Sequence, residues 1–175
     1  MPMSLHAALI PNWLQMLGAV QGLLDKAEAF VADGGLDEEA FLQSRLADDM
    51  LPLAYQFKSC WTHSAVALQA VGNGRFAPEM TPPPGRIDPL RKMILDAHSA
   101  CEQVSEEELE QAADKPMVFT IGDRFRLDFT TRDFLLSFSQ PNLYFHAATA
   151  YAILRKEGVP LGKRDFLGAL RVVQG

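Results

Sequence analysis

Apolar residues that recur every three or four positions over long stretches are the feature that most restricts the fold of this chain. The first stretch runs from Ser4 to about Ala32, and Ser4 is a suitable N-cap. Its apolar positions are Leu9, Trp13, Leu17, Val20, Leu24, Ala27 and Val31. This spacing makes one face of a helix about 40 Å long. Such a helix needs partners of similar length to cover its apolar face, which predicts a helical bundle.

Capping signals predict three more long helices. They cover residues 48–71, 88–104 and 131–157. We expect Asp48 or Asp49 to cap the first of them, because short acidic side chains accept bonds from the free amides of a first turn. Asp88 followed by Pro89 is a typical helix start for the second. Pro141 should bend the third, since proline lacks the donor that a helix interior needs.

A change of period precedes the last long helix. Phe125, Leu127 and Phe129 alternate with charged residues, after a Gly122-Asp123 turn. A period of two with a glycine-containing turn is typical of a small β-hairpin. The chain contains neither internal repeats nor a flexible linker, so we predict one all-α domain over residues 1–175, a four-helix bundle with this hairpin.

Composition narrows the classes of function. The net charge is −6 and the basic residues are scattered, which argues against a nucleic-acid partner. The richest apolar run, residues 143–154, contains His146 and is shorter than the ~18 residues of a membrane span. Cys60 and Cys101 fall inside helical stretches, and no cleavable amino-terminal signal is recognisable. We therefore expect a cytoplasmic protein without a membrane partner.

Polar residues on two of the apolar helices are the candidate site. Asn142 and His146 are four residues apart, and so lie on the same side of the last helix. Asp49, Gln56 and His63 are spaced by seven and share approximately one face of the second. If these faces oppose each other, they line a polar pocket. Such a pocket could bind a small molecule, hold a divalent metal or place a histidine for acid–base chemistry.

Each of these residues also has a structural interpretation. Asn142 follows Pro141 and could bind backbone groups freed by the bend. His146 could be a core histidine bonded to a carbonyl or a tyrosine. Asp49 could act only as a cap, and His63 could face solvent.

The last helix is apolar on nearly every side between Leu143 and Leu154. A helix of this kind is either central in a bundle or shared between a core and a subunit interface. We expect a homodimer on this basis. A purely structural or dimerisation module is accordingly one alternative for the function.

Two segments read FLLSFSQPNLYFHAATAYAILRKEGVPLGKRDFLG and RLADDMLPLAYQFK. They resemble an uncharacterised bacterial family of the DinB/YfiT-like superfamily. The similarity covers nearly the whole chain, as far as Gly168. The resemblance implies a four-helix bundle that is often dimeric. Better characterised members bind a divalent metal through three histidines, one on the second helix and two spaced by four on the last, and some are thiol transferases.

The resemblance assigns positions to this metal site. His146 is similar to the second histidine of the last-helix pair, Asn142 stands in place of the first, and Gln56 takes the helix-two position. Two of the three ligands are therefore not histidine, which implies a degenerate site with weak affinity for Zn, Ni or Mn. The leading expectation is a bundle that binds a small molecule beside these residues. A metal-dependent hydrolase or thiol transferase is the enzymatic alternative.

Overall fold

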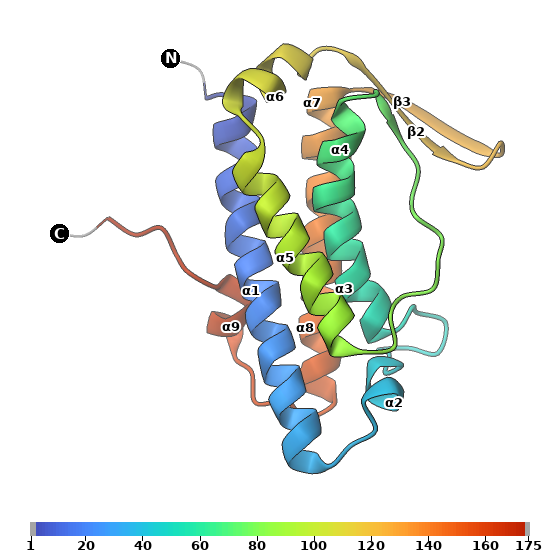
Figure 1. Ribbon diagram of the computed structural model, residues 1–175, viewed down its shortest axis with the longest axis vertical. Helices are drawn as coiled ribbons and strands as arrows, with labels where there is room; N and C mark the ends of the chain where they lie inside the picture. Colours follow the sequence, from blue (N-terminus) through green and yellow to red (C-terminus); the bar gives the residue numbers. More distant parts are fainter. Residues whose placement is uncertain (1–2, 174–175) are drawn as a thin grey trace.

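A bundle of four long helices with a small sheet at one end makes up the fold. The computed structural model describes residues 3–173 (Figure 1). Two of the four are single helices, α1 (Leu5–Gly34) and α5 (Ile87–Gln103). The other two are composite and consist of α3 (Leu53–Trp61), η1 (Thr62–Val66) and α4 (Ala67–Val71), and of α7 (Thr131–Asp133), η2 (Phe134–Ser139) and α8 (Gln140–Lys156). The predicted helical bundle is confirmed.

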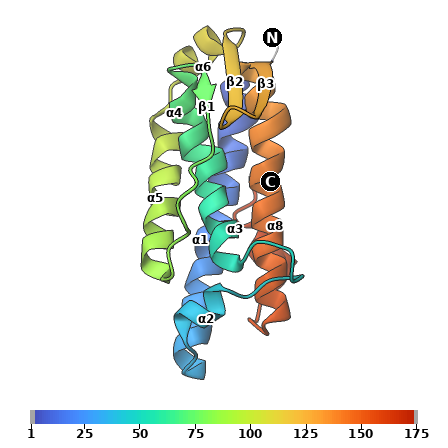
Figure 2. The same ribbon diagram turned by 90° about the vertical axis from the view of Figure 1, so that its right-hand side faces the viewer.

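Three short helices connect or cover these rods. They are α2 (Glu38–Leu42), α6 (Glu106–Ala112) and α9 (Lys163–Leu167). Local caps explain where several helices begin: the Ser4 hydroxyl accepts from the Ala7 amide, and Ser105 with Glu108 forms a capping box. α3 lies between α5 and α8 in the turned view (Figure 2).

The predicted start of the second long helix is wrong. Asp48 and Asp49 lie in an exposed turn, and α3 begins only at Leu53, after Pro52 in extended conformation. Proline fits the position just before a first turn but removes a donor further inside, so the helix starts after it.

The start of α5 also differs from the prediction. Asp88 lies inside the first turn, and the amide of Ile87 donates instead to the Glu38 carboxylate of α2 at 2.5 Å. Because this cap comes from a distant part of the chain, local sequence could not predict it.

A three-stranded sheet closes one end of the bundle. The predicted hairpin is confirmed as β2 (Pro116–Ile121) and β3 (Phe125–Thr130). A third strand, β1 (Arg75–Phe76), pairs parallel to β2 and gives the order β1-β2-β3. Gly74 permits this pairing, because its φ is +67° and a Cβ there would lie 2.9 Å from the Pro116 carbonyl oxygen.

Aromatic rings fill the space between the sheet and the helices. Phe76 of β1 is fully buried, with ring centroids 5.2 Å from Phe134 and 5.9 Å from Phe119. Phe138 lies 4.7 Å from Phe119 and 5.6 Å from Phe134. This phenylalanine cluster packs the sheet against η2. It also contacts His63, whose ring centroid lies 5.8 Å from that of Phe76.

A buried lysine holds the proline-rich connection against α3. Lys58 is 3% exposed, and its ammonium pairs with the Glu79 carboxylate. The same ammonium donates to the Thr81 carbonyl at 2.5 Å and to the Thr81 hydroxyl at 3.0 Å. Since a buried charge requires such partners, this pairing keeps the connection alongside the helix that carries the candidate site.

Candidate functional site

Two histidines and a glutamine meet between α3 and α8. The Nδ1 atom of His146 on α8 lies 2.8 Å from the Oε1 atom of Gln56 on α3. About two helical turns beyond Gln56, in η1, the ring of His63 lies nearly parallel to that of His146, with centroids 5.7 Å apart. Three of the residues singled out in the sequence therefore form one cluster, called here the histidine cluster.

Hydrogen bonding fixes the tautomer of His146. The Gln56 amide nitrogen donates to the Leu51 carbonyl oxygen at 2.8 Å, so the amide oxygen must face His146. That oxygen can only accept, which means that Nδ1 of His146 carries the proton. In the neutral ring the lone pair is then on Nε2, pointing away from Gln56. Gln56 thus sets which nitrogen of His146 can accept a bond from a ligand.

His63 is the more deeply buried imidazole. Its side chain is 9% exposed and packs against Phe76 and, edge-on, against Phe138 at 5.7 Å. Its Nδ1 atom is buried and has no hydrogen-bond partner among residues 3–173. An unsatisfied buried polar atom is costly, and it is often found where a protein binds something. The position within a π-helical turn fits this view, because such turns are frequent at functional sites.

Burial keeps both imidazoles neutral. The pKa of His63 is lowered from 6.5 to about 3, mainly by desolvation and in smaller part by the neighbouring His146. Desolvation likewise lowers the pKa of His146 to about 4. At neutral pH the histidine cluster therefore presents lone pairs and no charge.

Asn142 and Asp49 do not join the cluster. The Asn142 side chain donates to the Phe138 carbonyl of its own helix at 2.7 Å, as the structural interpretation held. Asp49 lies in the exposed turn before α3, where the helix had been predicted to start. The heptad spacing that joined Asp49 to Gln56 fails because the backbone there is not helical. The same spacing holds for Gln56 and His63, because the backbone between them is helical throughout.

The donor set fits a divalent metal poorly. Residues 3–173 contain no group of three or more His, Cys, Asp and Glu side chains arranged to hold an ion. Two imidazoles and one amide oxygen, from Gln56, are what the cluster offers. Moreover, the desolvation that disfavours an imidazolium also disfavours a dication without a carboxylate to neutralise it.

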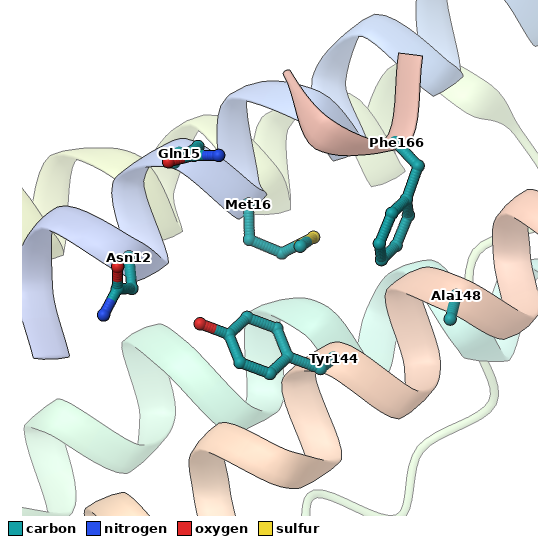
Figure 3. Close-up of a pocket in the computed structure, with 6 residues that line it drawn as sticks. All are labelled: Asn12, Gln15, Met16, Tyr144, Ala148 and Phe166. Carbon is teal, nitrogen blue, oxygen red and sulfur yellow. The ribbon is translucent and has the colours of Figure 1, made fainter. Parts of the chain in front are cut away.

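A separate pocket lies on the other side of α8 and was not predicted. It has a volume of about 370 Å³ and is lined by Asn12, Gln15, Met16, Tyr144, Ala148 and Phe166 (Figure 3). Figure 3 shows the Met16, Tyr144 and Phe166 side chains around the hollow between α1, α8 and α9. Of the three residues predicted to line a pocket, Gln56 and His146 meet, whereas Asn142 bonds to its own helix. Sequence could not find the pocket of Figure 3, because α1 and α8 supply most of its lining and Phe166 of α9, a short helix without apolar periodicity, completes it.

Comparisons with known proteins agree with the fold and with the resemblance seen in the sequence. A crystal structure of a DinB family member protein from Shewanella denitrificans is similar, with a TM-score of 0.80 and 29% sequence identity. The similarity covers 98% of this chain and 96% of that chain. No curated protein matches the chain. Residues 5–167 match the domain of unknown function DUF1993, and this DinB-like helical bundle therefore belongs to the DUF1993 family.

Proposed function

We propose that the protein binds a small neutral molecule at the histidine cluster, with Nε2 of His146 as the acceptor for a hydroxyl or amino donor of the ligand. The observation that carries this proposal is the fixed chain from the Leu51 carbonyl through Gln56 to His146 Nδ1. A preorganised acceptor beside aromatic rings is typical of sites for partly apolar ligands. Tyr55 and Phe145, with centroids 5.9 and 5.3 Å from His146, supply those rings.

The pKa of His146 favours binding over base catalysis. A general base is most effective when its pKa lies near the working pH. With a pKa of about 4, His146 takes up a proton weakly at neutral pH, yet it remains a good hydrogen-bond acceptor. The desolvation that keeps the imidazoles neutral also disfavours binding of a charged ligand. The cluster thus suits a neutral donor such as an alcohol, phenol or amide.

Titration with phenol and with anisole tests this proposal. The two probes have similar aromatic bodies, but only phenol carries a donor. We expect phenol to shift the His146 imidazole resonances with about fivefold higher affinity than anisole, because one hydrogen bond contributes about 1 kcal/mol. His146→Ala should remove the difference, while the half-exposed His98→Ala should preserve it. Equal affinities for the two probes, or shifts that survive in His146→Ala, would contradict the proposal.

A divalent-metal enzyme, hydrolase or thiol transferase, is the second candidate. The closeness of two neutral imidazoles, His63 and His146 with centroids 5.7 Å apart, favours it, since imidazole is a common ligand for Zn and Ni. Calorimetric titration of Zn²⁺, Ni²⁺ and Mn²⁺ into the native protein and His146→Ala separates the candidates. Stoichiometric binding that is lost in the variant would place the metal enzyme first.

A further inference from the structure

The β2–β3 hairpin carries an exposed apolar surface. It extends away from the helices at the sheet end of the bundle (Figure 1). Near its turn Ile121 is 45% exposed, Phe125 is 49% exposed and Leu127 is 36% exposed. β3 is also the edge strand of the sheet within residues 3–173. Apolar side chains next to a free strand edge are typical of a surface that pairs with another chain.

The register of the sheet shows which backbone groups of β3 are free. The Val118 amide donates to the Gly74 carbonyl oxygen on the β1 side, so the backbone hydrogen-bonding groups of Val118 point away from β3. The direction of the backbone N–H and C=O groups alternates along a strand. The backbone groups of Phe119 therefore face β3, and those of its partner Leu127 face β2. The residues on either side of Leu127, namely Arg126 and Asp128, therefore present their amides and carbonyls to the open edge.

The side chains at that edge select one antiparallel register with a second copy. A two-fold axis at Arg126 would place two arginines opposite each other, and a two-fold axis at Asp128 would place two aspartates opposite each other. Pairing about Leu127 instead places each Arg126 opposite an Asp128. Like charges directly opposite destabilise a strand pair and opposite charges stabilise it. In the single chain Arg126 and Asp128 pair with each other on one face of β3, and they are 64% and 66% exposed, so both side chains can exchange this partner for its counterpart across the edge.

We propose that β3 pairs antiparallel with β3 of a second copy of this chain, about a two-fold axis at Leu127, to form a continuous six-stranded sheet. The two Leu127 residues on the axis form no backbone hydrogen bonds with each other. The backbone hydrogen bonds between the two copies form at the two Arg126–Asp128 pairs. Phe125 then lies beside Phe129 of the partner subunit on the same face as Leu127. The edge is short, so the dimer is concentration-dependent.

Disulfide crosslinking of Leu127→Cys tests this pairing. Residues opposite each other without backbone bonds have Cα atoms about 4.5 Å apart, within disulfide range. Phe125→Cys is the matched control, because residue 125 does not face its own symmetry mate. The native Cys60 and Cys101 thiols are buried, and burial raises the pKa of Cys101 to about 12, so neither competes under mild oxidation. We expect crosslinking at residue 127 at least tenfold faster than at residue 125, whereas equal rates would overturn the proposal.

Charge exchange gives an independent readout by analytical ultracentrifugation. Arg126→Asp should weaken the dimer at least tenfold, since two like-charge pairs form per dimer, and Asp128→Arg should do the same. The double variant restores opposite charges and should recover the wild-type dissociation constant. A double variant that stays monomeric, or a wild type that is monomeric at millimolar concentration, would overturn the pairing. So would a dimer that Ala148→Glu disrupts and the single charge changes do not, because the interface would then be the exposed face of α8.

Discussion

Lowering the pH from 6.5 to 4.5 is expected to reduce the free energy of unfolding by about 4 kcal/mol. The unfolded chain binds protons at His63 and His146 below pH 6.5, whereas the folded protein does so only near pH 3 and pH 4. In this window the unfolded state holds more protons, so stability falls as the pH falls. Each histidine contributes up to about 1.4 kcal/mol per pH unit, with less near the ends of the window. Urea unfolding at a series of pH values measures the slope.

Two variants assign this slope to the histidine cluster. His63→Phe, in a site already lined by aromatic rings, should remove about half of the pH dependence. His98→Gln is the matched variant outside the cluster, since His98 lies at the surface beside Glu102. A wild-type protein whose stability is flat between pH 6.5 and 4.5 would show that the imidazoles are not desolvated.

Phe76→Ala is expected to cost about 4 kcal/mol of stability and to raise the pKa of His63. Phe76 is 1% exposed and joins the sheet to the phenylalanine cluster, so its removal leaves a cavity. The cavity borders the His63 ring, and water that enters it would relieve the desolvation that holds the pKa near 3. Urea unfolding and NMR titration of the His63 resonances measure the two effects.

Phe145→Ala is the matched control for this change. Phe145 also contacts a histidine of the cluster, but it is 57% exposed. Its removal should change stability by no more than about 0.5 kcal/mol, as for most surface sites. If Phe76→Ala is too unstable to titrate, the volume-retaining Phe76→Leu should show the smaller shift in the same direction. A stable Phe76→Ala protein with an unchanged His63 pKa would contradict the proposed role of the phenylalanine cluster.

The helices and the hairpin could be predicted from sequence because their signals are local. Apolar spacing in α1, the capping box at Ser105 and the alternation in β3 each depend on residues close together in the chain. Two of the differences arise where distant contacts decide. Glu38 caps α5 from another helix, and β1 exists only because two residues find β2 as a partner.

The candidate site was predictable in part for the same reason. Helical spacing placed Gln56 and His63 on one face and His146 on the opposing helix, and the structure brings these three together. It could not show that Asn142 turns back to its own backbone. Nor could it show that the Gln56 amide is oriented by the Leu51 carbonyl, because that bond depends on the turn before α3. The tautomer of His146 is thus a property of the fold that no sequence pattern records.

Long-range ¹H–¹⁵N NMR of the histidine side chains determines the tautomer of His146, because the nitrogen shifts report which ring atom carries the proton. We expect His146 to be neutral at pH 7, protonated on Nδ1, and to titrate near pH 4. Gln56→Leu should release this preference, since the acceptor for Nδ1 is then absent. A His146 ring protonated on Nε2, or one that titrates near pH 6.5, would contradict the histidine cluster as described.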